Sequence, residues 1–85
     1  MADSASLPAL GLIELDSIAL GVLTGDAMVK TAPVASIHAG TVHPGRYLVM
    51  VAGDTASVEI ALDVGRTAGG AAVLDSMFLP DVHAK

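Results

Sequence analysis

The chain has 85 residues, a formal net charge of −5 at pH 7 and 53% hydrophobic residues, with one Tyr and one Phe. Its four basic residues are scattered and form no basic patch, which argues against nucleic-acid binding. The absence of cysteine excludes disulfides and thiolate-held metals. No uncharged apolar run reaches the ~18 residues that span a bilayer, and the acidic start of the chain lacks the basic region of a signal peptide, so no membrane role is expected.

A chain of this length fits one small domain, near the lower end of what buries a self-sufficient core. Ala, Val, Leu, Ile and Gly must do most of the packing. So many small apolar side chains indicate that part of the apolar surface is buried against other subunits. We expect a loose polar lead-in over residues 1–8 and a single domain over residues 9–85.

The first half of the chain predicts a strand followed by a helix. Ala9–Leu15 is an apolar run that reads as a strand, and Asp16 or Ser17 can cap the helix that follows. Asp26 and Lys30 stand four apart in the order that favours a helical ion pair. Pro33 ends the helix. The helical spacing itself is carried by Ile18, Val22 and Val29, with Ala19, Leu23 and Met28 beside them.

The middle of the chain predicts a β-hairpin. Val34–Val42 alternates loosely and reads as a strand, and Tyr47–Gly53 is a dense β-prone run. Between them, Pro44 presets its own φ and Gly45 permits a positive φ, which suits a type II turn.

The last part predicts a second helix and a final strand. Asp54 or Thr55 caps the helix, Ala68–Gly70 stops it, and Asp63 and Arg66 are near enough to pair. One face of this helix is formed by Val58, Ala61, Leu62 and Gly65. Ala72–Pro80 reads as the final strand. The order β-α-β-β-α-β predicts an α+β, ferredoxin-like fold, in which two helices cover one face of a four-stranded antiparallel sheet.

No constellation of residues indicates catalysis. The serines do not stand in G-x-S-x-G, and the glycines form neither G-x-G-x-x-G nor a phosphate loop. His38, His43 and His83 are far apart in sequence, with no helical pair that would hold a metal. We therefore predict a protein that is not an enzyme and that needs no metal and no cofactor.

Four strings of residues, in order, resemble the bacterial microcompartment (BMC) shell domain. They are ALGLIEL, GDAMVKTA, YLVMVAGDTASVEIALDVG and VLDSMFLPDVHA, and together they cover residues 9–84. The usual family wording is close to A-L-G-M-I-E-T, D-A-M-V-K-A-A, V-R-G-D-V-x-A-V and V-I-P-R-P-H. The likeness is strongest to the first half of tandem shell proteins of the propanediol-utilisation type.

The resemblance implies a structural tile inside a bacterial microcompartment in the cytoplasm. Such domains form hexamers, or trimers of tandem chains, and pack with themselves and with other shell proteins into a layer that encloses enzymes. Small metabolites cross this layer at a central pore. Because the chain has its own Met1 and a complete final strand, we expect a single-domain hexamer rather than half of a tandem protein.

The predicted turn matches the family's pore loop, usually K-I-G-S-G. The pore-lining residues implied here are Thr41, Val42, His43, Pro44, Gly45 and Arg46. His43 and Pro44 depart from the family pattern, in which glycine and serine expose backbone amides that favour anions. In tandem relatives a cysteine in this loop holds an iron–sulfur cluster, which needs thiolates that this chain lacks. Arg46 either neutralises nearby acids or faces the pore mouth.

Symmetry-related copies of His43 around one axis would form a ring of titratable groups. Such a ring would be nearly neutral at pH 7 and would become cationic as the pH falls. The alternative is that His43 is an exposed turn residue with no role.

The resemblance also implies an assembly edge at Lys30, Asp81 and His83. Lys30 matches the family lysine at the hexamer edge, although the ion pair with Asp26 is a purely structural alternative. The family's edge arginine is replaced by Asp81, which removes a donor, so lateral tiling is less secure than the ring.

A different class of function stays open on the same fold. A trimeric regulatory domain that binds a small metabolite at subunit clefts would show ligand affinity and no sheets. The mass of the native particle separates this alternative from the shell hexamer.

Overall fold

The computed structural model describes residues 9–80. The elements are β1 (Ala9–Leu15), α1 (Ile18–Thr31), β2 (Ser36–His43), β3 (Arg46–Gly53), α2 (Thr55–Gly69), a 3₁₀ turn (Gly70–Ala72) and β4 (Val73–Leu79). The predicted order of strands and helices is confirmed, and the 3₁₀ turn is an addition. Residues 1–8 and 81–85, and with them the predicted lead-in, lie outside the described residues.

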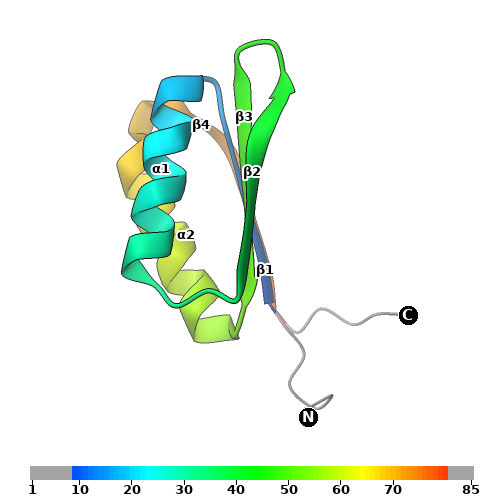
Figure 1. Cartoon of the computed structure of the whole chain (residues 1–85), viewed down its shortest axis with the longest axis vertical. Coiled ribbons are helices and arrows are strands. Elements are labelled where there is room, and N and C mark those ends of the chain that lie inside the picture. The colour runs from blue at the N-terminus through cyan, green and yellow to red at the C-terminus, as the bar shows by residue number, and fades with distance from the viewer. Residues whose placement is uncertain (1–8, 81–85) are drawn as a thin grey trace, which may run out of the picture.

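The strands form one sheet in the order β2-β3-β1-β4, in which every neighbouring pair is antiparallel. Both helices lie on the same face of this sheet, and the other face carries no helix (Figure 1). This confirms the ferredoxin-like α+β fold. Residues alternate along the inner strand β1, where Ala9, Gly11, Ile13 and Leu15 are buried towards the helices.

Each helix begins at a polar cap. Ser17 Oγ accepts a hydrogen bond from the Leu20 amide at 3.1 Å. The Asp54 carboxylate accepts hydrogen bonds from the Ser57 amide at 2.8 Å and from the Ser57 hydroxyl at 3.0 Å. These bonds lower the pKa of Asp54 because they stabilise its charged form, and the bond from the Ser57 amide has the largest effect. Both caps were among the predicted alternatives.

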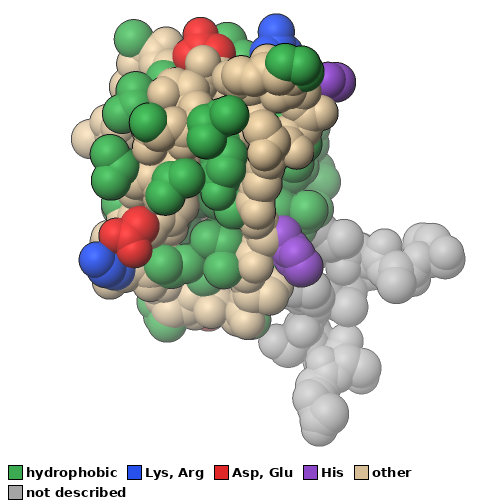
Figure 2. Space-filling view, turned by 45° about the horizontal axis from the view of Figure 1, so that its top comes forward, with side chains coloured by type: hydrophobic (Ala, Val, Ile, Leu, Met, Phe, Trp, Pro, Cys, Tyr) green, Lys and Arg blue, Asp and Glu red, His purple; other side chains and the backbone are tan. Residues whose placement is uncertain are grey.

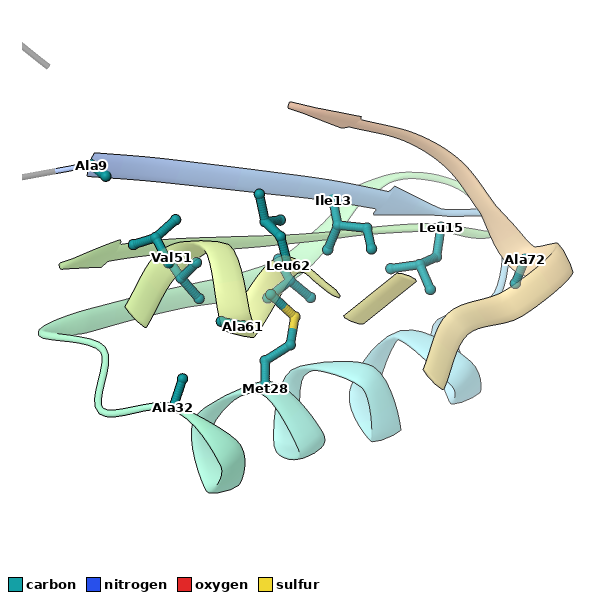
Figure 3. Packing of buried hydrophobic residues seen from close by; sticks show 11 residues of the cluster. Ala9, Ile13, Leu15, Met28, Ala32, Val51, Ala61, Leu62 and Ala72 are labelled. Atoms are coloured by element: carbon teal, nitrogen blue, oxygen red, sulfur yellow. The ribbon is translucent and has the colours of Figure 1, made fainter. Parts of the chain in front are cut away.

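The core lies between the sheet and the helices. Ile13, Leu15 and Val51 point down from the strands, and Met28 of α1 and Leu62 of α2 point up towards them (Figure 3). All five residues are buried, with an exposed fraction of no more than 1%. The inward face predicted for α2 is confirmed, because Val58, Ala61, Leu62 and Gly65 are all buried.

Small residues bring α1 close to the sheet. Its buried residues are Gly21, Thr24, Gly25 and Met28. A Cβ on Gly21 would lie 2.7 Å from Tyr47 Cβ, so only glycine fits there. Of the residues whose spacing predicted the helix, Met28 alone is buried, and Ile18, Val22 and Val29 remain exposed.

Two local predictions need correction. β2 begins at Ser36 rather than Val34, because Val34 and Ala35 belong to the loop after Pro33. In that loop the Val34 amide donates to the Ala32 carbonyl, and the Ala35 amide donates to the Ala52 carbonyl. Arg66 does not pair with Asp63. Its Nε donates instead to Ser76 Oγ of β4, at 3.0 Å.

Within residues 9–80, neither helix is long and apolar enough to cross a membrane. Over the same range, no three His, Asp or Glu side chains gather as they would around a metal ion.

Candidate functional site

The β2–β3 hairpin extends past the helix layer at one end of the molecule (Figure 1). All six of the predicted pore-lining residues lie on this projection and are exposed: Thr41, Val42, His43, Pro44, Gly45 and Arg46. The sequence therefore located a single, continuous and accessible segment.

The tip of the hairpin is a tight corner. His43 pairs with Arg46 across the two strands, and Pro44 and Gly45 make the turn between them. Gly45 has a φ of 76°, the positive value that a type II turn requires at this position. The pairing shifts register between Thr41 and His43, so the strand ends in an irregularity. Such a bulge re-aims the side chains near it.

Arg46, the charged residue next to the turn, forms an ion pair within the chain. Arg46 Nη1 lies 3.3 Å from Glu14 Oε2 on the neighbouring strand β1. The arginine side chain is 49% exposed and the glutamate side chain 28%. Of the two roles predicted for Arg46, the structure shows the neutralisation of an acid. His43 is left as the titratable group at the turn itself.

The predicted edge lysine lies on the last turn of α1. Lys30 Nζ is 2.9 Å from Asp26 Oδ2, so the predicted ion pair is present, and the lysine side chain is 73% exposed. The C-terminal end of α1 and the far ends of the strands lie opposite the hairpin (Figure 1). Asp81 and His83 lie outside the described residues, and β4 ends two residues before Asp81.

Apolar side chains lie on the outer surface of the helix layer. Ile18, Val22 and Val29 form an exposed stripe along α1, and Val22 is 51% exposed. Leu23 is exposed beside them. Figure 2 shows hydrophobic side chains spread over this face. Large apolar side chains gathered on one surface are typical of an interface between proteins.

The face of the sheet without helices also carries apolar side chains, among polar ones. Cross-strand pairing places His38, Met50, Leu12 and Met77 in one row across all four strands. Two shallow hollows of about 170 Å³ each lie on this face, and Leu48 lines both. Sequence reading missed this surface, although the alternation within β1 contained the signal.

A further hollow of about 440 Å³ lies between α2 and β4. Its apolar part is formed by Ile60, Leu62 and Phe78, and Glu59, Asp63 and Arg66 add charges. Arg66 Nε donates to Ser76, and neither acid forms an ion pair within residues 9–80. The hollow has no nucleophile next to a base, so it does not resemble a catalytic site.

The family model described as the BMC domain matches residues 9–82. The chain belongs to the BMC domain family. This confirms the resemblance seen in the sequence. The BMC family is one of bacterial microcompartment shell proteins, which are structural rather than enzymatic and lie in a microcompartment within the cytoplasm.

Named relatives agree with the BMC assignment. The bacterial microcompartment shell protein PduT of Citrobacter freundii is 42% identical over 76 residues, which is 89% of this chain and 41% of that protein. The shell protein EutK of Salmonella typhimurium is 42% identical over 60 residues, covering 71% of this chain and 37% of that protein. The chain thus spans about two fifths of the length of these relatives.

A solved BMC-type structure has the same fold. It is a microcompartments protein from Desulfitobacterium hafniense, with a TM-score of 0.87 and 42% identity. The match covers 91% of this chain and 43% of that one.

Proposed function

We propose that this chain is a shell tile that closes into a cyclic hexamer, with its hairpins around a central pore for small metabolites. The tile assembles with copies of itself and with other shell proteins around encapsulated enzymes. The hairpin carries the proposal, because it is a narrow, exposed projection at one end of a chain that belongs to the BMC family.

The shape of the molecule supports a radial arrangement. Its principal extents are 39 × 26 × 15 Å, so it is long and thin. Thr41–Arg46 lies at one end, and the C-terminal end of α1, with Lys30, lies at the other (Figure 1). A ring that gathers the hairpins at its axis would therefore carry Lys30 towards its rim, where neighbouring rings meet.

The two apolar faces support closure by copies of the same chain. The α1 stripe of Ile18, Val22 and Val29 lies on the helix side, and the row containing Leu12 and Met50 lies on the opposite side of the sheet. Two different apolar faces favour head-to-tail contacts, and such contacts close into a ring when the rotation between neighbouring copies permits closure. Covering both faces would bury surface that a lone chain exposes.

Native mass spectrometry of the purified protein, followed by electron microscopy at high concentration, tests the proposal. A six-fold mass with sheets or tubes supports the shell tile. A stable folded monomer contradicts it. A three-fold mass with no higher assembly favours a trimeric regulatory domain that binds a small metabolite.

A further inference from the structure

We propose that His43 makes the hairpin ring a proton-controlled binding site for small anions. The inference rests on the proposed function, because it needs several copies of the hairpin around one axis. The site would be weak when the imidazoles are neutral and strong when they are protonated. Its ligands are small anions such as carboxylates, phosphates and sulfate.

His43 is the residue of the turn that can change its charge. Thr41, Val42, Pro44 and Gly45 are uncharged. Arg46 is directed to Glu14 at 3.3 Å, so its charge is balanced within the same chain. In a ring, the net charge of the tips is therefore set by protonation of His43.

The backbone of the turn cannot replace this charge. Proline has no N–H, so Pro44 removes a donor from the corner that would face the axis. Neutral imidazole offers one N–H donor, and the imidazolium ion offers two donors and a full charge. Anion binding at this tip thus depends on the side chain of His43 more than on the amides around it.

His43 forms no ion pair with the described charged groups of the hairpin and the neighbouring strands. On its own hairpin these are Arg46 and, further down β2, His38. On β1, next to β3, Glu14 is paired with Arg46. Asp16 follows the end of that strand and bonds the Ala72 carbonyl through its backbone amide, so its carboxylate keeps its charge. Asp75 of β4 lies beyond Glu14 in the register. The first turn of α1, which is the helical turn nearest to the hairpin, contains no charged residue.

The consequence for permeation follows from ring electrostatics. Rings of charged side chains select the ion of opposite sign, and a cleft with one sign of charge raises the local concentration of its ligand. Histidine is the side chain whose charge changes near neutral pH, so acidification would turn a neutral constriction into a cationic one. Acidification on either side would then favour the passage of anions.

Sulfate is a suitable probe because it stays a dianion throughout this pH range. Its binding is measured by isothermal titration calorimetry at about pH 5.5 and 7.5 and at low, constant ionic strength, after native mass has been recorded at both pH values. In the wild-type ring we expect sub-stoichiometric binding, less than one sulfate per chain, that is about tenfold or more tighter at the lower pH.

Three variants make the result specific. His43→Asn keeps a polar side chain and should lose the binding at both pH values. His43→Lys carries a fixed charge and should bind at both. His38→Asn removes the other described histidine of β2 and should behave as the wild type.

The outcomes separate the two proposals. A wild-type ring that binds sulfate equally at both pH values, or a response that survives in His43→Asn, overturns the inference and leaves the shell tile intact. Failure to form any ring, seen in the mass alone, overturns the proposed function and the inference together.

Discussion

Arg46 Nη1 lies 3.3 Å from Glu14 Oε2, so an ion pair links the tip of the hairpin to the inner strand β1. Glu14→Gln would leave Arg46 without its counter-charge. In the proposed ring, we expect sulfate affinity at about pH 7.5 to rise towards the wild-type affinity at about pH 5.5. Because the pair is partly exposed, the free energy of unfolding should change by no more than ~1 kcal/mol.

The matched control for this variant is Asp26→Asn. It breaks the other described ion pair, between Asp26 and Lys30 at 2.9 Å, at the end of the molecule away from the hairpin. It removes the same charge, so a general effect of net charge would appear in both variants. Equal sulfate affinities in the two variants would rule out a local effect of Arg46.

A second prediction concerns the close contact of α1 with β3. A Cβ on Gly21 would lie 2.7 Å from Tyr47 Cβ, whereas one on Gly25 would lie 3.6 Å from a Val49 methyl. Gly21→Ala should therefore destabilise the protein by about 1–3 kcal/mol through overpacking. Gly25→Ala should be neutral or stabilising by up to ~1 kcal/mol, because alanine favours the helix. Urea unfolding of both variants checks the contrast.

These two glycines show why part of the fold could be predicted and part could not. The strand Ala9–Leu15 and the helix start at Ile18 agree with the structure, because alternation and capping are local signals. The buried face of α1 is not a local signal. Periodicity marks large apolar residues, whereas close approach to Tyr47 requires a small one, and that requirement is visible only once the helix lies on the sheet.

The candidate site divides in the same way. The corner at Pro44 and Gly45 follows from the conformations that these two residues allow, so the sequence predicted it directly. The partners of Glu14 and Arg66 depend on which strands lie side by side, and spacing along the chain placed Arg66 with the wrong partner. What gathers at the hairpin tips depends on other copies of the chain and stays a prediction.

A third prediction concerns a buried hydroxyl. Thr24 is fully buried in α1, and its Oγ1 has no hydrogen-bond partner among the described residues. Replacing this hydroxyl by a methyl group removes the cost of burying a polar group without a hydrogen bond, and it keeps the shape of the side chain. Thr24→Val should raise the free energy of unfolding by about 1 kcal/mol in urea titrations.

Thr31→Val supplies the contrast, because Thr31 Oγ1 donates to the Ala27 carbonyl at 2.8 Å and lies in water. That variant should be neutral or slightly destabilising. If Thr24→Val lowers stability as well, the hydroxyl of Thr24 has a partner, such as a buried water.

The cap of α2 predicts how stability varies with pH. The pKa of Asp54 is lowered in the folded chain by the hydrogen bonds from Ser57. A lowered folded-state pKa gives stabilisation that is present above the unfolded-state value and is lost as the pH falls through the folded-state value. Asp54→Ala should therefore reduce the urea midpoint at neutral pH, and the difference from the wild type should shrink in acid.

Ser17→Ala serves as the control, because it removes the cap of α1 without removing a charge. It should cost about 1 kcal/mol at every pH. A wild-type advantage over Asp54→Ala that persists unchanged at the lowest pH would show that the charge of Asp54 is not what stabilises α2.

The last prediction separates the ring from the layer. Lys30 is 73% exposed on its side chain and lies at the end of the molecule away from the hairpin. Its pair with Asp26 is of the exposed helical kind, worth about 0.3–0.5 kcal/mol, so Lys30→Ala should fold nearly as well as the wild type. If Lys30 is an edge residue, this variant should keep the six-fold mass and lose the sheets seen by electron microscopy.

The control is Asp26→Asn, which breaks the same ion pair but keeps the lysine. It should keep the six-fold mass and the sheets. Loss of sheets in both variants would assign the effect to the helical ion pair, and sheets in both would remove Lys30 from the edge.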